Sequence, residues 1–225
     1  MAQAQRVFMA GGTGFIGRHL IPALIARGHH VKALVRAGSE HRLPLGCDLV
    51  TGDPLDRRTF VGQIGEVDTY VHLVGVPHPS PAKTDQFFNV DLPAAREAVD
   101  AAVEAGVRHF VYVSVAQPAP IMRAYQQSRA QAEGHLARAR LNATILRPWY
   151  VIGPGRRWPM ALQPFYFFME RVPRWRTTAL RLGLVNLDAM IAATVRAVED
   201  PPQGTRFLTV PDIREAGRWA SHPAA

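Results

Sequence analysis

The chain has 225 residues, of which 48% are hydrophobic and 20% are charged, a composition that excludes an intrinsically disordered protein. Its net charge of +8 at pH 7 is compatible with an anionic ligand, a nucleic acid or an anionic membrane surface. Cys47 is the single cysteine, so no internal disulfide can form, and we expect a protein of a reducing compartment, the cytoplasm. We find neither a signal-peptide pattern nor an apolar run of the roughly 20 residues that a membrane span needs.

Apolar runs typical of strands alternate with amphipathic stretches typical of helices. The predicted strands, in chain order, cover residues 6–10, 30–35, 48–53, 68–75, 107–115, 143–148 and 205–210. The predicted helices cover residues 15–28, 54–63, 87–106, 125–140 and 188–200. Strands that alternate with crossover helices form a parallel sheet covered on both faces, so we predict an α/β protein with a doubly wound sheet. We expect one domain over residues 1–225, in which residues 148–187 and 205–225 form a small appendage on the substrate side.

A glycine-rich segment, "AGGTGFIG", joins the first predicted strand to the first predicted helix. Gly11 allows a sharp turn, Gly14 a close approach of a pyrophosphate, and Gly17 close packing of the helix. Phosphates then bind to free N–H groups at the helix N-terminus. The strand–turn–helix context predicts a Rossmann-like dinucleotide site, because the motif requires that context. The candidate cofactor contacts in this turn are Gly11, Thr13, Gly14, Phe15, Ile16 and Gly17.

The end of the second predicted strand indicates which dinucleotide binds. An NAD site commonly has an acidic residue there, which holds the ribose hydroxyls. This chain has Arg36 instead, followed by Ser39 and Arg42. A guanidinium suits a 2′-phosphate, so we expect NADP rather than NAD. The alternative is that Arg36 is a solvated surface charge.

With these residues in place, the chain resembles the short-chain dehydrogenase/reductase superfamily, in particular its atypical branch of NmrA-like proteins and relatives of a complex I accessory subunit. The segments that carry the resemblance are "GGTGFIG" (11–17), "GD" (52–53), "FNV" (88–90), "VRHFVYVS" (107–114), "YQQSRAQAE" (125–133), "TILRPWYVIGPG" (144–155) and "LVNLD" (184–188). The resemblance implies a site near the adenine at Gly52 and Asp53, cofactor contacts from Val74, Gly75, Val76 and Pro148, and a catalytic set of Tyr125, Arg129 and Ser114.

Tyr125 is followed four residues later by a cation, Arg129, at the position where this family has a lysine that binds the nicotinamide ribose. A cation favours the phenolate form of tyrosine and so helps it to move a proton. Arginine supplies a permanent charge but has no proton to give. The alternatives are an ordinary helical Tyr125, an Arg129 paired weakly with Glu133, and a Ser114 that only ends its strand.

Two further segments have several interpretations. The loop "VPHPSP" (76–81) follows a strand and is either part of the ligand-site rim or a plain proline-rich loop. Residues 158–176 could pack onto the domain, line a substrate pocket, or form a homodimer or peripheral membrane contact. We find no nucleic-acid motif and no metal-ligand spacing. The sequence thus favours an NADP-dependent oxidoreductase acting on a small, fairly apolar carbonyl or alcohol, with a non-catalytic NAD(P)-binding redox-sensing or assembly protein as the alternative.

Overall fold

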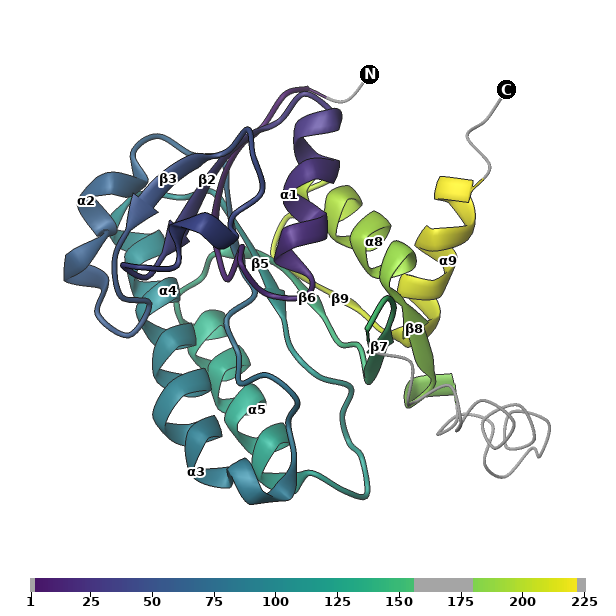
Figure 1. The fold of residues 1–225 in the computed structure, drawn as a ribbon. Helices are drawn as coiled ribbons and strands as arrows, with labels where there is room; N and C mark the ends of the chain where they lie inside the picture. Colours follow the sequence, from purple (N-terminus) through teal and green to yellow (C-terminus); the bar gives the residue numbers. More distant parts are fainter. Residues whose placement is uncertain (1–2, 156–179, 222–225) are drawn as a thin grey trace.

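A seven-stranded parallel sheet forms the centre of the protein (Figure 1). The structure, a computed structural model, describes residues 3–155 and 180–221. The strand order is β3-β2-β1-β4-β5-β6-β9. The strands are β1 (Arg6–Ala10), β2 (His30–Val35), β3 (Asp48–Thr51), β4 (Thr69–His72), β5 (His109–Val113), β6 (Asn142–Leu146) and β9 (Thr205–Leu208).

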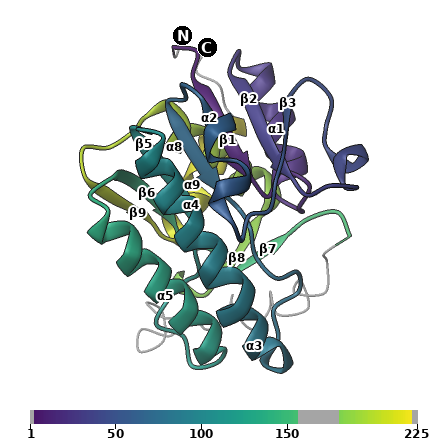
Figure 2. The ribbon, with the colours of Figure 1, turned by 90° about the vertical axis from the view of Figure 1, so that its left-hand side faces the viewer.

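Helices cover both faces of this sheet, which confirms the predicted doubly wound α/β class (Figures 1 and 2). On one face, Leu20 of α1 and Met190 of α8 belong to one buried cluster with the sheet. On the other face, Val99 of α4 and Leu136 of α5 belong to a second cluster. The helices are α1 (Gly17–Ala26), α2 (Val61–Ile64), α3 (Thr84–Gln86), α4 (Leu92–Glu104), α5 (Arg123–Arg138), α8 (Leu187–Glu199) and α9 (Val210–Ser221).

The order of the strands reverses between β1 and β4, which pair in parallel from Val7 and Thr69 onwards. Consecutive strands β1, β2 and β3 extend the sheet to one side, and β4, β5 and β6 extend it to the other. The loops that follow β1 and β4 therefore run in opposite directions and leave a crevice between them at the carboxyl ends of these strands. Ligands of doubly wound sheets bind in such a crevice. The position of the glycine-rich turn, directly after β1, agrees with that rule.

The predicted helix 54–63 is broken, and five predicted strands are shorter than expected, namely those at 48–53, 68–75, 107–115, 143–148 and 205–210. Strand β4 ends at His72 and β5 ends at Val113, so the residues after them lie in loops at the ligand edge. The helix expected near 54–63 is a 3-10 turn, η2 (Arg57–Thr59), followed by the single turn of α2. Asp56 caps the start of η2, because its side chain accepts a hydrogen bond from the Arg58 amide, and Phe60, with a non-helical φ of −141°, separates η2 from α2.

The C-terminal part of the chain differs from the predicted appendage. Strands β7 (Tyr150–Ile152) and β8 (Leu184–Asn186) form a separate two-stranded parallel sheet. Strand β9 instead pairs with β6, so residues 205–208 belong to the main sheet and not to an appendage. The surface predicted over residues 158–176 lies outside the described residues. Within the parts of the chain that the structure describes, no helix is long and apolar enough to cross a membrane.

Candidate functional site

The glycine-rich turn brings the start of α1 against the end of β1. Gly11 has a φ of +92°, which other residues rarely adopt, and a side chain there would lie 2.8 Å from the Leu73 carbonyl carbon. A side chain on Gly17 would lie 2.6 Å from the Gly12 Cα and would also collide with the Gly11 oxygen. The backbone is therefore packed too closely for any Cβ at either position. This packing directs the N-terminus of α1 toward the cavity described next.

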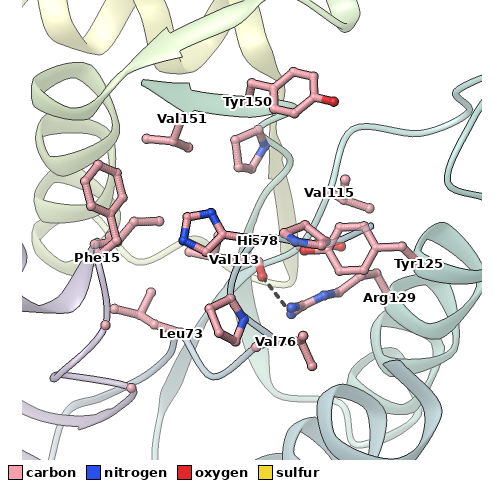
Figure 3. A pocket seen from close by; sticks show the side chains of 18 of the residues that line it. Phe15, Leu73, Val76, His78, Val113, Val115, Tyr125, Arg129, Tyr150 and Val151 are labelled. Carbon is pink, nitrogen blue, oxygen red and sulfur yellow. Dashed lines mark hydrogen bonds between the residues drawn. The ribbon is translucent and has the colours of Figure 1, made fainter. Parts of the chain in front are cut away.

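A cavity of about 300 Å³ lies at the carboxyl ends of the strands (Figure 3). It collects residues from the glycine-rich turn, from the loops after β4, β5 and β6, and from α5. The predicted site residues that line it are Gly11, Gly14, Phe15, Ile16, Gly17, Gly75, Val76, Ser114, Tyr125, Arg129 and Pro148. The structure thus brings together, in one place, residues that the sequence assigned separately to the cofactor and to catalysis.

The other predicted residues lie outside this cavity. Thr13 is half-buried within the glycine-rich turn, and the side chain of Val74 packs into the core on the face of α4 and α5. Arg36 is exposed directly after β2. Gly52 and Asp53 follow β3, where the Asp53 carboxylate accepts a hydrogen bond of 2.9 Å from the Leu55 amide. The cavity and these three residues lie at the same edge of the sheet, the one formed by the carboxyl ends of the strands. Arg36, Gly52 and Asp53 lie on the far side of β1 from β4, at the ends of β2 and β3.

Several cavity residues were absent from the predicted set, namely Leu73, Pro77, His78, Pro79, Val113, Val115, Trp149, Tyr150 and Val151. Some of them could be anticipated from the sequence, because the loop "VPHPSP" follows a strand and was a candidate for the rim of the ligand site. Pro77, His78 and Pro79 of that loop line the cavity. Tyr150 and Val151 could not be found in this way, since they reach the cavity through the small β7–β8 sheet.

Arg129 is held by a set of buried partners. Its Nη1 donates to the Tyr112 hydroxyl at 3.2 Å and to the Val113 carbonyl at 3.2 Å, and its Nη2 donates to Asp91 Oδ2 at 2.9 Å. Asp91 lies at the end of a π-helical turn, η4 (Phe87–Asp91), and also accepts a hydrogen bond from the Val76 amide at 2.7 Å. The suggested partnership of Arg129 with Glu133 is wrong.

The ion pair between Arg129 and Asp91 is strengthened by its burial away from water. Arg129 is 4% exposed and Asp91 is 1% exposed. Burial opposes the charge of Arg129, but the neighbouring Tyr112, Tyr125 and Asp91 outweigh it and raise its pKa above the ordinary value. Arg129 therefore stays charged, and in a buried site it stays paired.

Tyr125 lies beside this charge. The Arg129 guanidinium carbon lies 5.1 Å from the centroid of the Tyr125 ring, and Phe87 packs against the ring from another side at 4.9 Å between centroids. Figure 3 shows both the tyrosine and the arginine at the same wall of the cavity. The Tyr125 ring therefore packs against a buried cation that is itself paired with Asp91.

Ser114 lines the cavity, but its hydroxyl hydrogen is engaged. Its Oγ donates a hydrogen bond of 2.6 Å to Glu133 Oε1. The same carboxylate accepts hydrogen bonds from Gln117 and Arg147. Ser114 can therefore accept a hydrogen bond from a ligand in this arrangement, but its own proton is directed away from the cavity.

Comparison with known proteins agrees with this architecture. Residues 11–158 match the NAD(P)H-binding family. A ceramide reductase of Caulobacter vibrioides is 29% identical over 214 residues, which are 94% of this chain but 66% of that protein. A 3-diazoavenalumate denitrifying reductase of a Streptomyces species is 28% identical over 97% of this chain and 80% of its own length. This chain thus spans about two thirds of the length of the first relative.

Solved structures share the fold at low sequence identity. The Bordetella bronchiseptica enzyme WbmH, solved in complex with NAD+, superposes with a TM-score of 0.68 at 21% identity, over 99% of this chain and 84% of its own. A Thermotoga maritima UDP-glucose 4-epimerase, solved with UDP-glucose, gives 0.68 at 16% identity, over 98% and 84% of the two chains. With the family match over more than half of its length, this chain belongs to the NAD(P)H-binding family, which agrees with the resemblance to the atypical short-chain dehydrogenases/reductases that the sequence motifs indicated.

Proposed function

We propose that this protein is an NADP-dependent oxidoreductase that acts on a small, fairly apolar carbonyl or alcohol. The observation that carries the proposal is that the glycine-rich turn and the Tyr125–Arg129 pair line one cavity. Gly11 and Gly17 keep the turn tightly folded, because a Cβ at either would meet backbone atoms. Gly14 is exposed and lines the cavity, so the backbone there would let the pyrophosphate of a dinucleotide approach closely. A bound nicotinamide supplies or accepts the hydride in this chemistry.

Tyr125 would move the proton. In the reducing direction its hydroxyl gives a proton to the substrate oxygen as the carbonyl carbon receives the hydride, and in the oxidising direction the phenolate takes the proton back. Arg129 places a permanent positive charge beside the Tyr125 ring. The second hydrogen of Arg129 Nη2 lies outside the contacts with Asp91, Tyr112 and Val113 and would serve a ribose hydroxyl. Ser114 would act only as an acceptor, since it donates to Glu133.

The walls of the cavity support the substrate class. Most of the side chains that line it are apolar, including Val76, Val115 and Trp149. A volume of about 300 Å³ is at the lower end of the range for ligand sites. The two relatives described above carry the names of reductases, which supports reduction as the reaction class without identifying the substrate.

Arg36 is the basis for preferring NADP. It is exposed and follows β2 directly, at the position where an acidic residue would bind the ribose of NAD. The nearby Glu40 carboxylate is engaged, because it accepts a hydrogen bond of 3.0 Å from the Gly38 amide. We expect Arg36→Ala to weaken NADPH binding about tenfold or more while NADH binding changes little. Arg196→Ala, an exposed arginine in the last turn of α8, is the matched control, and equal losses for both cofactors would contradict the preference.

The oxidation of NADPH, followed at 340 nm with a panel of apolar ketones and aldehydes, tests the activity. We expect turnover by the wild-type protein and a loss of roughly 100-fold or more in Tyr125→Phe, with the Kd for NADPH retained. Turnover that is unchanged in Tyr125→Phe would refute the assigned role.

A second function is favoured by one specific feature. Asp91 neutralises Arg129, and Glu133 occupies the hydrogen of Ser114, so the cavity could bind a dinucleotide without turnover and serve redox sensing or assembly. Tight binding of NADPH with no turnover in any assay would support this alternative. Arg129→Lys separates a slow enzyme from a binding protein, because a gain in rate would identify the site as a weakened catalyst.

A further inference from the structure

His78 has no role in the reaction as proposed so far. It follows β4 in the loop "VPHPSP" and lines the cavity. Figure 3 shows its imidazole projecting into the middle of the cavity, between Phe15 and Tyr125. Neither ring nitrogen has a hydrogen-bond partner in the part of the chain that the structure describes.

The backbone holds His78 in an uncommon conformation. Its φ is +51°, in the left-handed region that residues other than glycine rarely enter. Pro77 and Pro79 flank it, and a proline restricts both its own φ and the residue before it. Such conformations persist where the surrounding structure fixes them, and they are frequent at ligand sites.

The loop around His78 is fixed by two polar contacts. Lys83 Nζ donates to the Pro77 carbonyl at 2.5 Å, and the Val76 amide donates to Asp91 at 2.7 Å. The second contact ties the loop to the same carboxylate that holds Arg129. The imidazole is therefore presented to the cavity by a loop that is held at Val76 and Pro77, the two residues before His78.

The other polar side chains around the cavity are largely engaged. Ser114 directs its hydrogen to Glu133, and Arg129 is bound by Asp91, Tyr112 and the Val113 carbonyl. No carboxylate is among the residues that line the described cavity. A neutral imidazole has one donor and one acceptor nitrogen, so His78 can bind a hydroxyl or a carbonyl group in an otherwise mainly apolar space.

We propose that His78 binds a second oxygen function of the substrate, apart from the oxygen that Tyr125 serves. The substrate class is then an apolar molecule with two oxygen functions, a hydroxy ketone, a diketone or the corresponding diol, and not a simple monofunctional ketone. His78 is a specificity-determining residue in this account. The inference rests on the proposed function for the role of Tyr125, but His78 can be tested without turnover.

The test measures binding of alcohols to the protein saturated with NADP+, by calorimetry or ligand-observed NMR. The probes are octan-2-ol and the 2,3-, 2,4- and 2,5-octanediols. We expect the wild-type protein to prefer at least one diol over octan-2-ol by about tenfold or more, and His78→Leu to lose most of that preference. His78→Gln, which keeps a donor and an acceptor, should retain part of it.

The matched control is His30→Leu, an exposed histidine at the first residue of β2, at the opposite edge of the sheet from the cavity. This variant should keep the wild-type preference. The inference is overturned if the wild-type protein prefers no diol, or if His78→Leu keeps the preference. A protein that selects diols through His78 but never oxidises NADPH would contradict the proposed function and leave the inference standing.

Discussion

Replacing Asp91 by alanine removes the carboxylate that pairs with Arg129 and accepts the Val76 amide. Both partners of the pair are at least 95% buried, so the guanidinium would be left charged and unpaired in the interior. Loss of one partner of a buried pair costs about 3–5 kcal/mol. For a chain of this length we expect the Tm to fall by about 6–20 °C.

Urea denaturation followed by circular dichroism measures this cost. The control is Asp100→Ala, since Asp100 lies on α4, pairs with His135 at 2.7 Å and has a side chain that is 39% exposed. Its loss should cost under about 1 kcal/mol. The double variant Asp91→Ala with Arg129→Met should regain stability relative to Asp91→Ala alone, because the unpaired charge is gone. A cost for Asp91→Ala no greater than that of the control would refute the reasoning.

Three further predictions concern the same region. A side chain on Gly17 would collide with the backbone of the turn, so Gly17→Ala should weaken NADPH binding at least about tenfold in a fluorescence titration. The control is Gly134→Ala, which should bind NADPH normally because its Cβ would approach no atom closer than 3.7 Å. A Cβ on Gly75 would overlap Arg129 Nη2, so Gly75→Ala should lower the free energy of unfolding by about 1–3 kcal/mol; Gly62→Ala, with nothing within 4 Å, should not lower it. Burial, and then the charge of Arg129, lowers the pKa of His72 from 6.5 to about 3, and burial lowers that of His109 to about 4. Both histidines are neutral in the fold but take up protons in the unfolded chain below pH 6.5. The free energy of unfolding should therefore fall as the pH drops below 6.5, by about 1.4 kcal/mol per pH unit for each histidine. Denaturation at pH 7 and at pH 5 should show a smaller loss of this free energy in His72→Leu than in the wild-type protein, and an equal loss would count against the burial argument.

The fold could be read from the sequence because each signal was local. The glycine-rich turn, the apolar strands and the amphipathic helices are all short-range patterns, and they predicted the doubly wound sheet correctly. The position of β9 could not be predicted in this way. Its residues 205–208 show only a strand pattern, and the choice of β6 as a partner depends on tertiary packing.

The central pair of the candidate site was predictable from the sequence, but the residues that pair with it were not. Tyr125 and Arg129 were expected together, and they lie together. No local pattern indicated that Arg129 would pair with Asp91, because the two residues meet only through the packing of η4 against α5. His72 on β4 is fully buried, and neither of its ring nitrogens has a hydrogen-bond partner among the described residues.

A crystal structure of the protein with bound NADP+ tests the central claim most directly. The account predicts the pyrophosphate at the glycine-rich turn, the 2′-phosphate near Arg36, and the nicotinamide in the cavity with its reactive carbon facing the space beside the Tyr125 hydroxyl. A dinucleotide bound elsewhere, or a nicotinamide turned away from Tyr125, would contradict it.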